Sequence, residues 1–120
     1  MAHVLVVEDD ADVAELLRTV LTFAGHSVEI AVDGPSALAA AAARRPDLVT
    51  LDWMMPGMTG VEVCRVLRRD ESLAATRILM LTAKSAPQDI ALARAAGADE
   101  YVVKPFSPRD LRQRIATLLA

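Results

Sequence analysis

Short apolar runs, spaced at near-regular intervals along the 120 residues, constrain the fold of this chain more than any other feature. The runs occupy residues 4–7, 28–31, 48–51, 78–81 and 101–103. Three of them are almost continuously apolar, which indicates strands buried on both faces, as in a parallel sheet. Between the runs, apolar residues recur at the spacing of an amphipathic helix, most clearly in segments 13–21 and 111–119.

The alternation of strands with helices predicts an α/β fold, a doubly wound five-stranded parallel sheet. Local signals agree: Gly34 with Pro35 is typical of a helix start, and Gly25 and Gly97 stand where helices should end. Asp12 with Glu15 resembles a capping box. The length suits one domain spanning residues 1–120, with an aliphatic core because only 3% of the residues are aromatic.

Charge and cysteine content exclude several classes of function. A net charge of −3 gives no electrostatic reason for the chain itself to bind nucleic acid or an anionic membrane. Cys64 is the only cysteine, so neither an intrachain disulfide nor a cysteine-based metal cluster can form. With no signal peptide or membrane span evident, we expect a cytoplasmic protein. His3 and His26 have no ligand spacing, and we interpret both, together with Cys64, as structural.

Polar residues follow four of the five predicted strands. Glu8 and Asp9 follow the first strand, Asp52 the third, Thr82 the fourth and Lys104 the fifth. Parallel strands in such a fold bring their carboxyl ends to one edge, where ligands bind. Like-charged carboxylates ~5 Å apart repel by roughly 3 kcal/mol per pair at an effective dielectric of about 20. A cation must offset this repulsion, and Mg²⁺, which takes carboxylates, waters and phosphate oxygens, fits.

These residue types are the ones that phosphoryl transfer needs. An aspartate can act as the nucleophile toward phosphorus, while an ammonium, a hydroxyl and a metal ion bind the equatorial oxygens of the transferred group. The sequence therefore predicts phosphoryl chemistry on Asp52 at this edge of the sheet.

Four segments resemble the receiver domains of two-component response regulators, a family that includes chemotaxis regulators. They are residues 6–10, 51–60, 82–83 and 101–106, in the order that the family has. The resemblance covers essentially the whole chain and implies a flavodoxin-like (βα)5 fold with strand order 2-1-3-4-5. Charges near the end of the chain further resemble the winged-helix transcriptional regulators of this family.

Carried over to this sequence, the resemblance implies that Asp52 is the phosphoacceptor and that Thr82 and Lys104 hold the phosphoryl oxygens. It also implies that Tyr101 is an aromatic switch that turns inward when Thr82 moves toward the phosphate. The bond between Lys104 and Pro105 is expected to be cis. The Mg²⁺ ligands would be Glu8, Asp9, Asp52 and, through its backbone carbonyl, Met54.

The implied partner is a sensor histidine kinase, or a phosphotransfer protein, that donates from a phosphohistidine. The chain would then be a signalling switch and no enzyme, catalysing only its own phosphorylation and dephosphorylation. Asp99, Glu100 and Asp110 with Arg109, Arg112 and Arg114 resemble a dimer face, which implies phosphorylation-dependent homodimerisation through the fourth helix, fifth strand and fifth helix. Met54 and Lys84 occupy positions that vary in the family and tune phosphoryl lifetime.

Three other functions are compatible with parts of this pattern, and each meets an objection. A Mg²⁺-dependent phosphatase of the haloacid dehalogenase type also uses a strand-end aspartate, but it needs an acid two residues later, where this chain has Met54. A pseudo-receiver that is never phosphorylated usually lacks an acid or the lysine, and none is missing here. A dinucleotide-binding turn is excluded because acidic residues replace its glycines. Asp10 alone is explained equally well as an acidic helix start.

Overall fold

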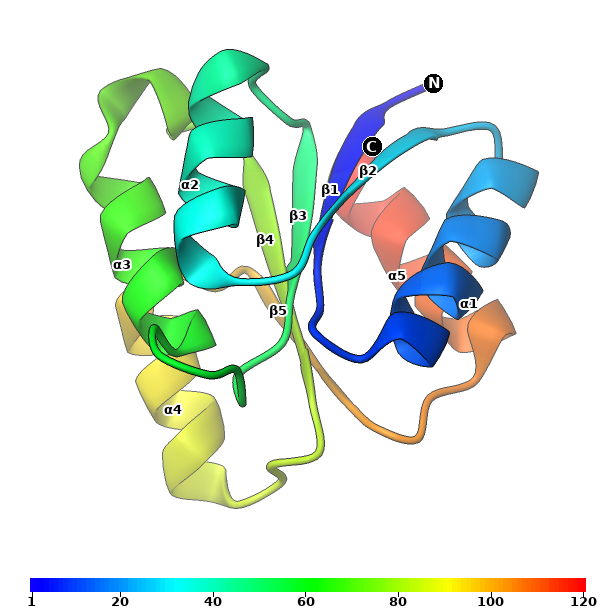
Figure 1. Ribbon diagram of the computed structural model, residues 1–120. Helices are drawn as coiled ribbons and strands as arrows, with labels where there is room; N and C mark the ends of the chain where they lie inside the picture. Colours follow the sequence, from blue (N-terminus) through cyan, green and yellow to red (C-terminus); the bar gives the residue numbers. More distant parts are fainter.

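Strands and helices alternate along the whole chain in the computed structural model, which describes residues 1–120 (Figure 1). The strands are β1 (His3–Val7), β2 (Ser27–Ala31), β3 (Leu48–Leu51), β4 (Arg77–Thr82) and β5 (Glu100–Val103). The helices are α1 (Ala11–Phe23), α2 (Gly34–Ala43), α3 (Gly60–Arg69), α4 (Pro87–Ala96) and α5 (Pro108–Leu119), with a short 3-10 helix η1 (Glu71–Leu73). Each apolar run singled out in the sequence lies inside one strand, so the predicted alternation is confirmed.

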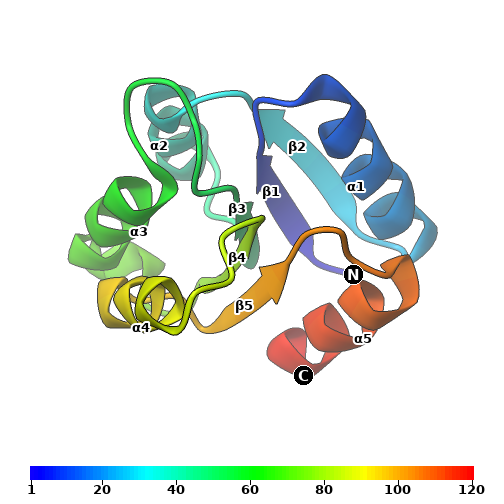
Figure 2. The ribbon, with the colours of Figure 1, turned by 90° about the horizontal axis from the view of Figure 1, so that it is seen from below.

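The sheet is parallel throughout, in the order β2-β1-β3-β4-β5, as predicted. Val7, at the end of β1, pairs with Ala31 and with Leu51, which end β2 and β3. The carboxyl ends of the strands therefore meet at one edge of the sheet. This edge lies at the bottom of Figure 1, and Figure 2 looks onto it from below.

Helices cover both faces of the sheet, α1 and α5 on one and α2, α3 and α4 on the other (Figure 2). Side chains of successive strand residues point to opposite faces. In β3, Val49 and Leu51 join a core cluster with α2, α3 and α4, while Leu48 joins the cluster beneath α1 and α5. Buried alanines on α2 and α4 let these helices approach the sheet closely.

The first residues of α1 differ from the sequence prediction. Asp10 caps α1: its Oδ1 accepts from the backbone N–H groups of Asp12, at 2.9 Å, and Val13, at 3.2 Å. The capping box predicted from Asp12 and Glu15 is wrong, because the helix begins at Ala11, one residue before Asp12. A capping box does form at α3, where Thr59 and Glu62 each accept from the other's backbone.

Two further sequence expectations have different outcomes. Gly25 and Gly97 lie just past α1 and α4 with φ angles of +94° and +114°, so both predicted helix ends are confirmed. Leu16 has the apolar spacing of segment 13–21, but it is 45% exposed. The longest helix, α1, has 13 residues, and none of the helices has the length and hydropathy needed to cross a bilayer.

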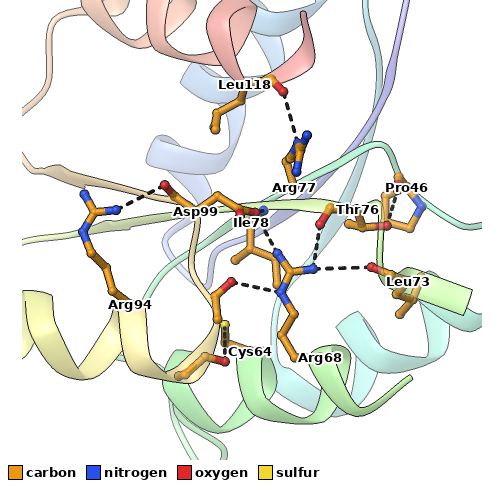
Figure 3. A network of polar contacts seen from close by, with 12 residues as sticks. Pro46, Cys64, Arg68, Leu73, Thr76, Arg77, Ile78, Arg94, Asp99 and Leu118 are labelled. Atoms are coloured by element: carbon orange, nitrogen blue, oxygen red, sulfur yellow. Dashed lines mark hydrogen bonds and ion pairs between the residues drawn. The ribbon is translucent and has the colours of Figure 1, made fainter. Parts of the chain in front are cut away.

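A polar network ties the opposite, amino-terminal edge of the sheet together (Figure 3). The guanidinium of Arg68, from α3, donates to the carbonyls of Gly97, at 2.9 Å, and Thr76, at 2.7 Å. It also pairs with the Asp99 carboxylate at 2.7 Å, and that carboxylate accepts from the Ile78 N–H at 2.8 Å. The network joins α3 to the starts of β4 and β5, away from the carboxyl ends where function was predicted.

Candidate functional site

Carboxylates from two neighbouring strands converge at the carboxyl edge of the sheet. Glu8 and Asp9 follow β1, and Asp52 follows β3; one carboxylate oxygen of each lies within 4.8 Å of the others. Glu8 is 2% exposed and Asp52 7%, whereas Asp9 is exposed. The strand order that places β1 beside β3 thus brings together the acids that the sequence predicted as a cluster.

Lys104 reaches this cluster from the end of β5. Its Nζ lies 2.7 Å from Glu8 Oε1 and 3.6 Å from Asp52 Oδ2, and its side chain is 20% exposed. The Lys104–Pro105 peptide bond is cis, as expected, and the Lys104 N–H donates to the Thr82 carbonyl at 2.9 Å. Lys104 is therefore an interior counter-charge and not a solvated surface lysine.

The site remains short of positive charge. Burial raises the pKa of Glu8 to about 6; a hydrogen bond from Lys104 opposes this shift, and the charge of Asp52 adds to it. Three carboxylates facing one ammonium leave an excess of negative charge in a partly buried place. The three carboxylates of Glu8, Asp9 and Asp52 are hard oxygen donors, and such a set fits Mg²⁺ well.

The raised pKa of Glu8 predicts an unusual pH dependence of stability. The pKa of Glu8 in the folded chain, about 6, exceeds the reference pKa of 4.5. Glu8 therefore contributes fully to the stability of the fold below about pH 4.5, and this contribution is lost as the pH rises through about 6. Without metal, Glu8→Gln should therefore be more stable than the wild type at pH 8, by about 2 kcal/mol. The advantage should shrink toward pH 4.5. Urea unfolding in EDTA across this range measures it, and a pH-independent difference between the two proteins would contradict it.

Thr82 and Tyr101 are linked through the loop between β4 and α4. Thr82 is fully buried, and its Oγ1 accepts from the Lys84 N–H at 3.3 Å. Tyr101 is 7% exposed, and its hydroxyl donates to the Lys84 carbonyl at 2.7 Å. Burial, with a smaller effect from Asp89, raises the pKa of Tyr101, so its hydroxyl stays protonated and can donate. The ring thus lies inward, and its hydroxyl is hydrogen-bonded to the protein backbone.

The segment after Asp52 contains one contact that sequence reasoning missed. A Cβ on Gly60 would lie 2.2 Å from the Asp52 carbonyl oxygen, and the Gly60 N–H donates to the Trp53 carbonyl at 2.9 Å. The backbone at the start of α3 therefore packs directly against the backbone that carries Asp52. The only sequence signal was a glycine that opens a helix already capped by Thr59. Met54 is 62% exposed, whereas Trp53 is buried.

The four residues for which the sequence indicated structural roles lie outside the cluster. Asp10 caps α1, in keeping with its interpretation as a helix start. Cys64 is buried, donates to the Ala96 carbonyl at 3.3 Å and has its pKa raised to about 11 by burial, so it remains an inert thiol. His3 contacts Ser27 at 3.0 Å, and His26 accepts from the Ala2 N–H at 3.2 Å. These contacts lie at the far edge of the sheet and fit structural roles.

Comparison with known proteins agrees with this geometry. The family model described as "Response regulator receiver domain" matches residues 4–116. The chain is 47% identical over 98% of its length to the DNA-binding response regulator MtrA of Mycobacterium tuberculosis, covering 50% of that protein. It is 40% identical over 97% of its length to the phosphate regulon transcriptional regulatory protein PhoB of Pseudomonas aeruginosa, covering 51%. The chain thus spans about half the length of the curated relatives it matches.

A solved structure shows the same fold over a full chain. The chemotaxis protein CheY4 of Vibrio cholerae superimposes with a TM-score of 0.94 at 38% identity, covering 99% of both chains. The agreement extends from the sheet to the helices on both of its faces.

Proposed function

The chain belongs to the response regulator receiver family of two-component signalling, and from this premise we propose that Asp52 is the residue that accepts the phosphoryl group. One observation carries the proposal: Asp52 Oδ2 lies 3.6 Å from Lys104 Nζ, inside a cluster with Glu8 and Asp9. Receivers take part in signalling with histidine kinases or phosphotransfer proteins, and the donor proposed here is a phosphohistidine of such a partner.

In the proposed reaction an oxygen of the Asp52 carboxylate attacks the phosphorus of the phosphohistidine. The new O–P bond forms as the P–N bond breaks, and the electron pair of that bond leaves with the imidazole. Lys104 would move from Glu8 toward the transferred oxygens, since its Nζ already lies between Glu8 and Asp52. Because Thr82 Oγ1 accepts from Lys84, its own hydrogen is free to donate to a phosphoryl oxygen. Bound Mg²⁺ would neutralise charge on those oxygens.

The rival functions have less support. A haloacid dehalogenase phosphatase requires an acid two residues after its nucleophile, and Met54 at that position is exposed and apolar. A pseudo-receiver needs none of the contacts made by Lys104, yet the acids and the lysine are all in place. We propose that the only chemistry catalysed by the chain is its own phosphorylation and dephosphorylation.

Intact mass spectrometry tests the assignment. After incubation with acetyl phosphate and Mg²⁺, the chain should gain a single adduct of about 80 Da, the mass of one phosphoryl group. The adduct should be absent in EDTA and should be removed by hydroxylamine, which cleaves acyl phosphates. An unmodified chain after Mg²⁺ and acetyl phosphate would favour the pseudo-receiver, and a hydroxylamine-resistant adduct would place the phosphate on another type of residue.

The proposed output surface is formed by α4, β5 and α5. On it Glu100 pairs with Arg94 at 3.4 Å and with Arg114 at 3.5 Å, and Arg114 pairs with Asp110 at 3.0 Å. Two other residues of the expected charge pattern have different partners: Asp99 pairs with Arg68, and the guanidinium of Arg112 lies over the Phe23 ring at 5.9 Å. Fewer charged residues than the sequence indicated are therefore available on this surface for contact with a partner.

We propose that phosphorylation promotes homodimerisation through this surface, with Arg94, Glu100 and Arg114 exchanging partners between two copies. Multi-angle light scattering with and without beryllofluoride, which mimics the phosphoryl group, should show a monomer becoming a dimer. Glu100→Ala should reduce the dimer fraction. Asp99→Asn should leave the dimer fraction unchanged, because Asp99 pairs internally with Arg68 and the surface charges stay in place. A monomer under both conditions would reject the proposal.

We further propose the extent and the location of the receiver unit. We place the receiver unit at residues 1–120, since α5 runs to Leu119, beyond the family match that ends at 116. A cytoplasmic location fits the single free, buried cysteine. With a net charge of −3 these residues would not contact nucleic acid directly. The relatives are named as DNA-binding or transcriptional regulators, which supports an output outside this segment.

A further inference from the structure

Lys84 makes three separate connections in the loop after β4. Its N–H donates to Thr82 Oγ1 at 3.3 Å, and its carbonyl accepts from the Tyr101 hydroxyl at 2.7 Å. Its ammonium lies 5.1 Å from the centroid of the Trp53 ring. One loop residue therefore connects the threonine, the tyrosine and the tryptophan that directly follows Asp52.

The contact with Trp53 gives the loop an anchor. Trp53 is 7% exposed and belongs to the core cluster beneath α2, α3 and α4, so its ring is held in place. Lys84 is half-buried although its neighbours Ala83 and Ser85 are exposed. Its ammonium makes no ion pair, unlike that of Lys104, the only other lysine of the chain. The aromatic face is thus the partner that this ammonium has.

We propose that Lys84 is a positioning residue whose ammonium, held over Trp53, fixes the loop in the conformation in which Tyr101 lies inward. The same contact fixes the Lys84 N–H that orients Thr82. This inference rests on the proposed function only where it concerns phosphoryl transfer, since the position of Tyr101 can be measured without a phosphodonor. A cation–π contact of ordinary strength corresponds to about a 3- to 30-fold change in the population of two conformations.

Tyr101 can be observed by spectroscopy without overlap, because the chain has one tyrosine and one tryptophan. We would label the chain with 3-fluorotyrosine and record ¹⁹F spectra without phosphodonor or metal. Lys84→Met keeps the length of the side chain but removes its charge, and it should shift the ratio of inward to outward Tyr101 by about 3- to 30-fold. Lys84→Arg, which retains a cation over the ring, should behave as the wild type. Ser85→Ala, an exposed neighbour, is the control for the loop.

A double-mutant cycle identifies the partner. In a Trp53→Leu background, which has no aromatic face, Lys84→Met should have no further effect on the Tyr101 ratio. Thermal unfolding shows whether each variant is folded. An unchanged ratio in Lys84→Met, or equal shifts in Lys84→Met and Lys84→Arg, would overturn the proposal. If the ratio shifts but no variant and no wild-type chain is phosphorylated by acetyl phosphate with Mg²⁺, the proposed function fails and this inference stands. If phosphorylation occurs, Lys84→Met should slow it while Lys84→Arg restores the rate.

Discussion

Replacement of Asp52 by asparagine should abolish the 80 Da adduct that acetyl phosphate and Mg²⁺ are expected to form on the wild-type chain. The amide keeps the shape of the carboxylate but has no anionic oxygen with which to attack phosphorus. Intact mass spectrometry, with both proteins treated in parallel, measures the loss.

The same change should not unfold the chain. Removing one of three crowded carboxylates relieves a repulsion of roughly 3 kcal/mol per pair at ~5 Å, and Lys104 keeps its 2.7 Å contact with Glu8. Asp52→Asn should therefore melt at the same temperature as the wild type or higher in EDTA. Asp10→Asn is the matched control: Asp10 follows Glu8 and Asp9 in the sequence but caps α1, and asparagine caps as well as aspartate. A phosphorylated Asp52→Asn chain, or an unphosphorylated Asp10→Asn chain, would contradict the assignment of Asp52.

The fold and the cluster were predictable because both depend on strand periodicity. The apolar run of residues 48–51 predicts a buried strand, and the residue that follows it, Asp52, must then lie at the carboxyl edge. The same reasoning places Glu8 after β1 and Lys104 after β5, and parallel order brings the three together. No knowledge of side-chain conformations was needed for these placements.

What the sequence could not predict depends on side-chain direction. Asp99 was placed with the surface acids, but its carboxylate turns back to Arg68, which reaches it from α3, 31 residues away in sequence. Tyr101 lies inward, in the core cluster, with its hydroxyl donating to the Lys84 carbonyl, a contact that no sequence pattern indicates. Leu16 fits the helical spacing of α1, yet it lies at the border of the buried stripe and stays 45% exposed. Such outcomes are decided by tertiary packing, which periodicity alone does not describe.

The contact between Gly60 and Asp52 predicts a second large effect. In Gly60→Ala, the new methyl group would lie 2.2 Å from the Asp52 carbonyl oxygen. The backbone fixes the positions of both atoms, so no change of rotamer can separate them. Either α3 or the segment carrying Asp52 must shift by about 1 Å, and overpacking of this kind costs roughly 3 kcal/mol. A displacement of that size at a nucleophile lowers rates by about 100-fold. Urea unfolding and the rate of adduct formation with acetyl phosphate measure the two effects.

Gly34→Ala separates this clash from the general effect of a methyl group at a helix start. Gly34 opens α2 as Gly60 opens α3, so the change in helix propensity is the same in both variants. A Cβ on Gly34 would meet the side chain of Met58, at 2.7 Å from its Cβ, and Met58 belongs to a loop and is partly exposed. Because that loop residue can yield whereas the Asp52 backbone cannot, Gly34→Ala should lose less stability and retain its phosphorylation rate. Equal losses in the two variants would show that the packing of Gly60 against Asp52 has no special part in placing the nucleophile.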